Sequence, residues 1–217
     1  MEITYLGHAS FLLKTKDGSM VFDPHINIGY DLPPVSAEVV SVSHGHYDHN
    51  NTLGVAGARQ VITDGDFEGY GFKVTSIKSY HDDKKGALRG ENFIRKVTCG
   101  GVTFAHLGDF GEDPNGFDFS DIIEVDFLFV PVGGKYTVNA DGAKKIFDIV
   151  RPRFVIPMHY KTEKSTVDIA SVNGFLRYFP TSKIIFTEST ISVDALLSAE
   201  LPSGRALLFD MPDGQSF

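Results

Sequence analysis

The sequence predicts an α+β fold in which β-sheets pack face to face and helices lie outside them. Short apolar or alternating segments rich in Val, Ile and Phe recur along the whole chain, which is typical of strands. Segments with helical periodicity are fewer, and glycine turns at residues 16–18 and 99–101 join neighbouring strands as hairpins. No linker, charge run or low-complexity segment divides the 217 residues, so we expect one domain over residues 1–217.

The predicted strands are distributed over the full length of the chain. They lie at residues 3–6, 11–15, 20–22, 39–43, 60–63, 72–80, 93–98, 102–107, 127–132, 154–157, 183–186 and 206–209. Residues 73–78 show the pattern most clearly, because polar and apolar side chains alternate there as in a strand with one buried face. The most apolar segment, residues 127–132, is far too short to cross a bilayer, so we expect no membrane insertion.

The best helical pattern covers residues 139–150. Asn139 or Asp141 can cap its first turn, its apolar side chains share one face, and Pro152 ends it. Further helices are expected at residues 166–178, 52–58 and 120–124.

Composition narrows the classes of function. The chain has 20 Lys and Arg against 28 Asp and Glu, and the net charge of -8 argues against a general nucleic-acid binder. Its one cysteine, Cys99, cannot form an internal disulfide, and we expect it to pack as a small core residue. The first five residues show neither the basic segment nor the long apolar stretch of a signal peptide, so we expect a cytoplasmic protein.

Three histidines and one aspartate are concentrated in residues 44–49. His44 and His46 follow an apolar strand and are two residues apart, so their side chains can converge on one ion. Asp48 and His49 come where the strand turns over and can face a neighbouring point. A solvated histidine-rich loop is the alternative, but the segment begins where a buried strand ends. Imidazole combined with carboxylate therefore predicts a site for zinc or a similar metal ion.

Three more metal-binding side chains follow predicted strands. His81 comes after residues 72–80, Asp109 after residues 102–107, and His159 after residues 154–157. Each would be an ordinary surface residue if considered alone. Together with the histidine cluster they predict the additional ligands that a site for two ions requires.

These residues, in this order, resemble the signature of the metallo-β-lactamase superfamily, H-x-H-x-D-H followed by a lone His, a Gly-Asp pair and a final His. Residues 6–10, 22–24, 106–109, 131–134 and 156–160 are similar to its lactonase-like branch, which includes ascorbate-6-phosphate lactonases and N-acyl-phosphatidylethanolamine phosphodiesterases. The resemblance extends from residue 3 to about residue 161. It implies a four-layer αββα sandwich of two mixed β-sheets with helices on the outer faces and metal ions at one rim.

The resemblance also implies the ligand sets. The first site would comprise His44, His46 and His81, and the second Asp48, His49 and His159, with Asp109 bridging the two ions. Two Zn²⁺ ions are implied, and Mn²⁺, Fe²⁺ or Ni²⁺ suit the same ligand types. Such ions lower the pKa of bound water from roughly 15.7 to about 7, so that hydroxide can attack a carbonyl or phosphoryl group. Asp48 would in addition orient the nucleophile or pass a proton.

Other polar residues are expected around the ligands. The resemblance makes Asp23 a carboxylate that orients a ligand histidine, the alternative being an aspartate that starts a turn before proline. It places His8 near the metals, where it contacts substrate or supports a ligand; otherwise it is a structural histidine. His106 is expected to be a buried partner and His25 an ordinary loop residue.

The glycine-rich loop at residues 133–137 joins a strand to a helix and suggests anion binding. Thr137 and Lys135 are expected to contact substrate or to belong to a plain tight turn, and Tyr160 is a candidate for the pocket rim. Asp82 and Asp83 follow His81 and would disfavour a highly anionic substrate unless nearby lysines or the metals compensate.

The function these patterns predict is metal-dependent hydrolysis of a small ester, lactone or phosphodiester. The substrate is expected to be a small molecule, and the charge of the ions favours an anionic one. A metal-binding sensor or scaffold without turnover is the alternative, and a nuclease is disfavoured because the chain shows no basic arm. A homo-oligomer is compatible with the sequence, but no pattern predicts one.

Overall fold

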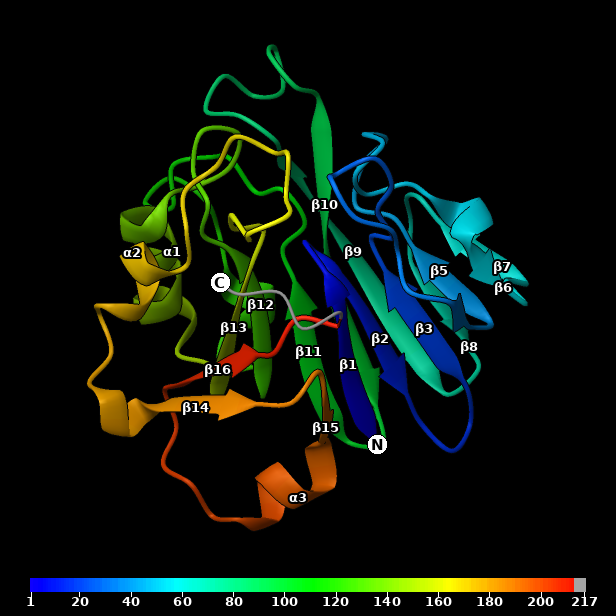
Figure 1. The fold of residues 1–217 in the computed structure, drawn as a ribbon. Coiled ribbons are helices and arrows are strands. Elements are labelled where there is room, and N and C mark those ends of the chain that lie inside the picture. The colour runs from blue at the N-terminus through cyan, green and yellow to red at the C-terminus, as the bar shows by residue number, and fades with distance from the viewer. Residues whose placement is uncertain (213–217) are drawn as a thin grey trace.

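The first of two facing β-sheets takes most of its strands from the N-terminal third of the chain (Figure 1). The computed structural model describes residues 1–212. This sheet contains β1 (Glu2–Gly7), β2 (Ser10–Lys14), β3 (Ser19–Phe22), β5 (Val39–Ser41), β7 (Gln60–Ile62) and β15 (Thr190–Ser192), in the order β15-β1-β2-β3-β5-β7. Phe11 and Leu13 of β2 enter the core between the sheets, whereas Leu12 faces the other side. The period-2 pattern of the sequence thus assigns each side chain its face.

The second sheet has eight strands. They are β8 (Phe67–Gly69), β9 (Phe72–Tyr80), β10 (Glu91–Cys99), β11 (Val102–His106), β12 (Phe127–Pro131), β13 (Phe154–Met158), β14 (Ile184–Thr187) and β16 (Arg205–Phe209), in the order β14-β16-β13-β12-β11-β10-β9-β8. Every residue of β12 and β13 is buried. Their uninterrupted apolar sequences are therefore explained by burial of both faces, one against the first sheet and one against helices.

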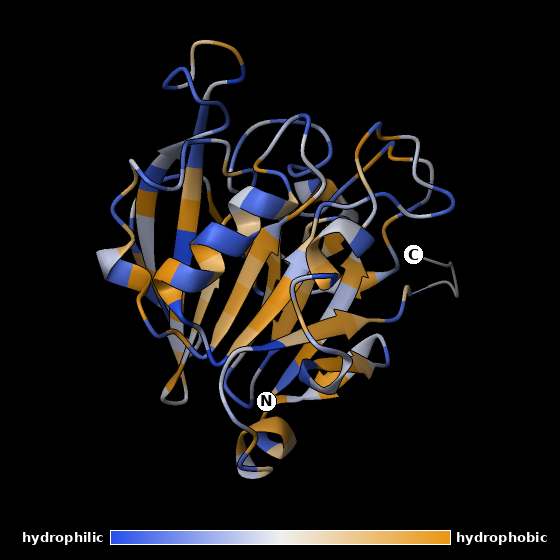
Figure 2. Ribbon diagram, turned by 90° about the vertical axis from the view of Figure 1, so that its left-hand side faces the viewer, coloured by the Kyte–Doolittle hydropathy of each residue, from blue (hydrophilic) through white to orange (hydrophobic). Residues whose placement is uncertain are grey.

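Helices cover the outer face of the second sheet. The helix α1 (Ala140–Val150) lies across the apolar strands with its hydrophilic face outward, and α2 (Asn173–Leu176) lies beside it (Figure 2). Asn139 caps α1 by accepting a hydrogen bond from the backbone N of Gly142 at 3.0 Å. A third helix, α3 (Val193–Ser198), packs near the N-terminus. Over residues 1–212, α1 is the longest helix, and none has the length and apolarity needed to cross a membrane.

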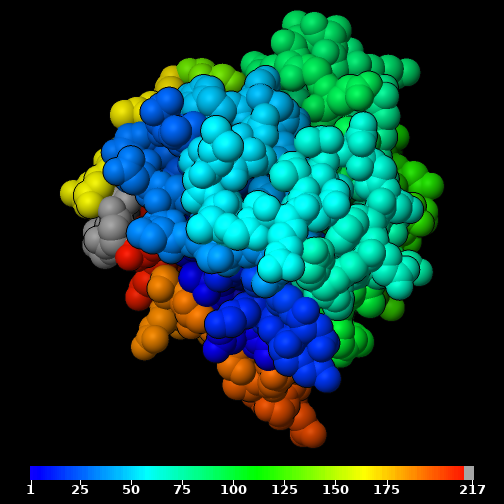
Figure 3. All heavy atoms as spheres, turned by 90° about the vertical axis from the view of Figure 1, so that its right-hand side faces the viewer, coloured from blue at the N-terminus to red at the C-terminus, as the bar shows by residue number. Residues whose placement is uncertain are grey.

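The outer face of the first sheet has a thinner cover. It is formed by the two-stranded sheet β4 (Val35–Ser36) and β6 (Val55–Ala56) with the preceding 3₁₀ turn η1 (Thr52–Gly54). Val21 and Val40 of the sheet pack there against Ala37 and Val55 in a second, smaller apolar cluster. Most of the surface on this side of the molecule comes from the first third of the chain (Figure 3).

The carboxyl ends of several strands meet at one rim of the sandwich. In the first sheet β1 and β3 are both antiparallel to β2, and β3 is parallel to β5, so these three strands run in one direction. In the second sheet β9 and β11 are both antiparallel to β10, and β11, β12 and β13 are parallel. Residues that follow β5 contact residues that follow β11. Loops from both sheets therefore share this rim.

The sandwich of two mixed sheets and the predicted strands are confirmed, with ends that differ by a few residues. The helix at residues 139–150 is also confirmed. The short elements β4, β6, β8, β15 and α3 were not predicted, nor was the 3₁₀ turn η3 (Thr181–Lys183). Residues 120–124 form a 3₁₀ turn, η2 (Ser120–Ile122), and residues 52–58 form η1 and β6 in place of a helix.

The helix predicted at residues 166–178 is wrong except for the four residues of α2. Residues 166–172 form an extended loop whose backbone bonds to distant segments. Thr166 N donates to Ile28 O at 2.8 Å, and Ala170 N donates to Gly133 O at 2.8 Å. These tertiary hydrogen bonds replace the i to i−4 bonds of a helix in a segment rich in β-branched residues.

Cys99 ends β10 before the predicted glycine turn, and it is buried as expected. Burial raises the pKa of its thiol to about 12. The thiol therefore stays protonated at neutral pH and packs as an apolar side chain.

Candidate metal centre

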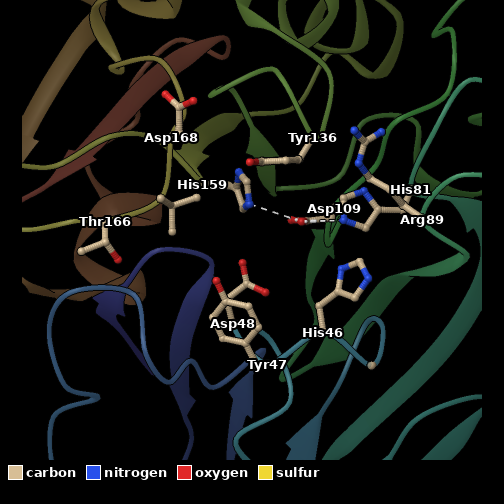
Figure 4. Close-up of a pocket in the computed structure, with 12 residues that line it drawn as sticks. His46, Tyr47, Asp48, His81, Arg89, Asp109, Tyr136, His159, Thr166 and Asp168 are labelled. Atoms are coloured by element: carbon tan, nitrogen blue, oxygen red, sulfur yellow. Dashed lines mark ion pairs between the residues drawn. The ribbon is translucent and has the colours of Figure 1, made fainter.

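The structure brings all seven predicted ligands together at the shared rim. The loop after β5 carries His44, His46, Asp48 and His49, and the loops after β9, β11 and β13 carry His81, Asp109 and His159 respectively. Figure 4 shows side chains from these loops directed toward a common centre. Parallel strand directions thus explain why ligands far apart in the sequence converge.

Asp109 lies at the middle of the cluster. Its Oδ2 is 3.0 Å from His81 Nε2 and 3.2 Å from His159 Nε2. Its Oδ1 is 3.2 Å from His49 Nε2, and His44 Nε2 is 3.9 Å from Oδ2. One buried carboxylate therefore faces imidazoles of both predicted sites, as a bridging ligand must.

The remaining ligand atoms form two groups. His44, His46 and His81 place one donor atom each within 4.8 Å of one another, which corresponds to the predicted first site. The donor atoms of the second group also lie within 4.8 Å of one another. This group contains the predicted second site, Asp48, His49 and His159, and in addition His8. His8 Nε2 is 3.4 Å from Asp48 Oδ2. The geometry thus places His8 among the ligand atoms themselves.

The distances between the donor atoms match those between atoms that bind the same metal ion. His49 Nε2 and Asp109 Oδ1 are 3.2 Å apart, yet neither has a hydrogen-bond partner within residues 1–212. Ligand atoms about 2.0–2.1 Å from a tetrahedral zinc ion lie about 3.3 Å from one another. The separations around Asp109 match that value, and both atoms are buried polar groups that need a partner. The cluster can therefore hold metal ions.

Asp23, which follows β3, orients one histidine of each group. Its Oδ1 accepts a hydrogen bond from Ser43 N at 2.7 Å, and its Oδ2 accepts from Ser43 Oγ at 2.6 Å and from His49 Nδ1 at 2.9 Å. Because Ser43 Oγ has donated its proton, it accepts from His44 Nδ1 at 3.0 Å. Nε2 of each ring consequently faces Asp109. Carboxylates in this position fix the ring and tautomer of ligating histidines.

Three residues of this region have left-handed backbone conformations that are uncommon outside glycine. His8, Asp23 and His159 have φ angles of 56°, 42° and 52°. His159 N donates to His8 O at 3.0 Å, which joins the loop after β13 to the loop after β1. Such strained conformations persist only where surrounding contacts hold them, and they are frequent at functional sites.

Burial keeps most of the imidazoles neutral. It lowers the pKa of His44 to about 3, with help from His49, and the pKa of His8 to about 3, with help from His159. Burial also lowers the pKa of His46. Neutral imidazole is the form that binds metal ions, so these rings are ready to do so at neutral pH.

In His49, Asp109 and Asp48, neighbouring charges outweigh the effect of burial on the pKa. Burial would lower the pKa of His49, but the carboxylates of Asp109 and Asp23 raise it well above its ordinary value. Burial would raise the pKa of Asp109, yet His159 and His49 hold it well below its ordinary value. In Asp48 burial is likewise outweighed by His8 and His49, so its pKa is lowered. The carboxylates remain ionised and can neutralise a bound cation.

Asn92 of β10 holds the turn that carries Asp109. Its side-chain oxygen accepts from Asp109 N at 2.9 Å, and its amide donates to Leu107 O at 2.9 Å and to Ser79 Oγ at 2.8 Å. Gly108 completes the turn with a φ of 54°. Sequence reasoning missed Asn92, although a polar residue at an inward position of an apolar strand is a usable signal.

Replacing Gly108 with alanine is expected to destabilise the protein by about 2–4 kcal/mol and to reduce its metal content. A Cβ at this position would lie 2.4 Å from Asn92 Oδ1 and 2.5 Å from Ser43 Cβ. Urea unfolding and elemental analysis measure the two effects. Gly116→Ala is the matched control, because its Cβ would meet only Asp113 O at 3.7 Å. Equal stability of the two variants would contradict this account of the turn.

A pocket of about 620 Å³ opens above the ligands. It is lined by Gly45, His46, Tyr47, Asp48, His81, Arg89, Asp109, Tyr136, His159, Thr166, Val167 and Asp168. Its size is that of small-molecule sites. Sequence reasoning missed the lining residues Tyr47, Arg89, Tyr136 and the loop 166–168, because none belongs to a metal-binding pattern.

Some predicted contacts lie elsewhere. Thr137 Oγ1 donates to Val138 O at 3.1 Å and does not line the pocket, whereas its neighbour Tyr136 does. Lys135 pairs with Asp168. Tyr160 is buried, and burial raises the pKa of its hydroxyl, so it does not form the rim.

The other histidines are structural in their contacts. His106 bonds through Nε2 to Ala9 O at 2.9 Å and stacks on Phe22, as expected for a buried partner. His25 differs from the expected ordinary loop residue, because it is fully buried and its Nε2 lies 3.1 Å from Leu6 O.

Comparison with known proteins agrees with this geometry. The chain matches the model of the β-lactamase superfamily domain over residues 2–159. A metal-dependent hydrolase of Carboxydothermus hydrogenoformans is 31% identical over 193 residues, which are 75% of this chain and 85% of that protein. One of Desulforamulus reducens is 29% identical over 194 residues, with the same coverage of 75% and 85%. The crystal structure of a candidate zinc-dependent hydrolase of the metallo-β-lactamase superfamily from Thermotoga maritima is 27% identical, covers 96% of this chain and 98% of its own, and has a TM-score of 0.73.

Proposed function

Because the chain belongs to the β-lactamase superfamily, we propose that it is a metal-dependent hydrolase of small molecules. The observation that carries the proposal is the position of Asp109, whose carboxylate lies within 3.2 Å of three imidazole nitrogens at the base of an open pocket. Relatives that are similar over most of this chain are named metal-dependent hydrolases, which supports the same reaction class.

Two ions are proposed, one at His44, His46 and His81 and the other at Asp48, His49 and His159, with Asp109 between them and His8 beside the second. Zinc suits neutral imidazole combined with carboxylate, and manganese, iron and nickel accept the same donors. The cluster divides into two groups around one carboxylate, which favours two ions over one.

When bound, such ions lower the pKa of a water molecule and polarise the oxygen of the group under attack. Asp48 would supply a carboxylate that can accept a hydrogen bond from the attacking water and so orient it toward the substrate. Its Oδ2 is held between His8 Nε2 at 3.4 Å and His49 Nε2 at 3.9 Å, on the pocket wall. Tyr47 and Tyr136 line the same pocket and would cover an apolar part of the substrate.

The proposed substrate is a small ester, lactone or phosphodiester. A pocket of about 620 Å³ and a net charge of -8 suit a small molecule better than a nucleic acid. Esters and lactones are attacked at a carbonyl carbon and phosphodiesters at phosphorus, and two metal ions could polarise the oxygen of either group.

The test combines metal analysis with a substrate panel. Protein purified without chelator is expected to contain about two transition-metal ions per chain. With zinc or manganese added, it is expected to hydrolyse at least one class among lactones, carboxylic esters and phosphodiesters, and chelation should remove that activity. Less than one ion per chain would contradict the two-ion site. Full metal loading without turnover of any class would favour the sensor or scaffold alternative.

A further inference from the structure

The loop at residues 82–90 presents Arg89 to the pocket in a defined position. The buried Asp82 carboxylate accepts four backbone hydrogen bonds, from Lys84 N at 2.8 Å, Gly86 N at 3.0 Å, Leu88 N at 3.0 Å and Arg89 N at 2.8 Å. Asp82 therefore acts as an internal anchor and not, as its position after His81 suggests, as a negative charge in the pocket. The last of its bonds fixes the backbone of Arg89 itself.

The Arg89 side chain lies over Tyr136 at the pocket wall. The guanidinium carbon is 5.4 Å from the centre of the Tyr136 ring, and both residues line the pocket (Figure 4). Tyr136 extends from the side of Arg89 toward His159, across the space above Asp109. The guanidinium therefore borders the space that a substrate bound at the ligands would occupy.

Arg89 is not neutralised by the protein. Among the residues that the structure describes, its guanidinium has neither a carboxylate partner nor a hydrogen-bond acceptor, so its N–H groups are available. Two other cations near the pocket, Lys135 and Lys161, have partners within the protein. Lys135 pairs with Asp168, and Lys161 Nζ donates to Ser165 O and Val167 O.

We propose that Arg89 is an anion-binding residue of the substrate pocket and that the substrate carries a carboxylate or phosphate group apart from the bond that is hydrolysed. A guanidinium offers paired N–H donors that match both oxyanions, and an aromatic face beneath it holds its plane. This substrate class rests on the proposed function. Lys135 and Thr137, the residues that the sequence pointed to for this task, are occupied by Asp168 and Val138.

Binding of stable probes tests Arg89 without any turnover. Metal-loaded wild-type protein, Arg89→Met and Arg59→Met are titrated by calorimetry with benzoate, phenylphosphonate and neutral benzamide. Arg59 is exposed and outside the pocket, so its variant removes the same charge without touching the site. Arg89→Met is expected to weaken binding of at least one anionic probe by about 10–100-fold, because hydrogen bonds to charged groups are lost. Benzamide binding and the Arg59→Met variant should be unchanged.

The pattern among probes identifies the anion. Loss confined to benzoate indicates a carboxylate, loss confined to phenylphosphonate indicates a phosphate, and loss of both indicates a site that accepts either. Arg89→Lys keeps the charge without the paired donors and is expected to recover only part of the affinity. If Arg89→Met binds both anions as tightly as Arg59→Met does, the proposal is wrong.

Kinetics separates this proposal from the hydrolase proposal. With 4-nitrophenyl hydrogen succinate, Arg89→Met is expected to raise KM about tenfold or more with little change in kcat, and with neutral 4-nitrophenyl butyrate neither should change. If wild type hydrolyses no ester but the Arg89-dependent binding persists, the hydrolase proposal fails and the anion site stands. If Arg89→Met alters both esters equally, the anion site fails and the hydrolase stands.

Discussion

Replacing Asp109 with alanine is expected to remove metal binding and reduce hydrolysis to background. The substitution deletes the carboxylate that lies within 3.2 Å of His49, His81 and His159, and with it the negative charge at the centre of the cluster. Without this group both proposed sites would lack their shared ligand, and without bound ions no water at the site would have a lowered pKa. Elemental analysis of protein purified in zinc-containing medium and assay of the substrate panel measure the two losses.

Two further variants show whether the effect belongs to the site. Asp126→Ala removes a partly buried aspartate away from the ligands, which accepts hydrogen bonds from Thr103 N and Thr103 Oγ1 at 2.9 Å. It is expected to lose some stability but no metal. Asp109→Asn keeps the shape but not the charge and is expected to retain less metal than wild type. A fully loaded and active Asp109→Ala protein would exclude the central role assigned to this carboxylate.

Replacing Asp23 with alanine is expected to weaken metal binding by about 10–100-fold, although Asp23 is not in either predicted ligand set. The variant loses the acceptor of His49 Nδ1 and of both Ser43 donors, so the rings of His49 and His44 are no longer oriented. Burial would raise the pKa of Asp23, but the hydrogen bond and charge of His49 lower it to about 2, so the variant removes an ionised carboxylate from the core. The metal-free protein is expected to lose about 3–5 kcal/mol of stability.

Competition titration with a chromophoric chelator measures the affinity, and urea unfolding of metal-free protein measures the stability. Asp23→Asn is the matched variant, because its amide oxygen can still accept from Ser43 N while its NH₂ group cannot accept from His49 Nδ1. It should therefore recover a small part of the stability through this one hydrogen bond but little of the affinity. Wild-type affinity in Asp23→Asn would show that this charge does not orient the ligands.

Local patterns predicted most of the strands, because alternation of Val, Ile and Phe with polar residues is sufficient to assign a buried face. Elements held by long-range backbone pairing were missed. In β15, Thr190 and Ser192 pair with Thr4 and Glu2 at the sheet edge without an apolar pattern. The helix at residues 166–178 failed for the same reason, because the backbone of Thr166 finds its acceptor in a distant loop.

The ligands could be anticipated because their residue types, spacing and places after strands are all properties of the sequence. The residues of the pocket wall could not be predicted from such properties. Whether Tyr136 or Thr137 faces the ligands depends on the backbone conformation of the turn between β12 and α1, which the sequence pattern does not specify. The role of Asp82 likewise depends on four amide groups whose positions exist only in the folded loop.

The ligand loops come from both sheets, and this gives bound metal a mechanical role beyond chemistry. His44 follows a strand of one sheet and His159 a strand of the other, roughly a hundred residues later in the chain. Two metal ions bound between these residues would cross-link the two sheets. Such a cross-link would stabilise the fold as a disulfide that closes a long loop does. A protein whose single buried cysteine has no partner to bond with would thus obtain its cross-link from its cofactor.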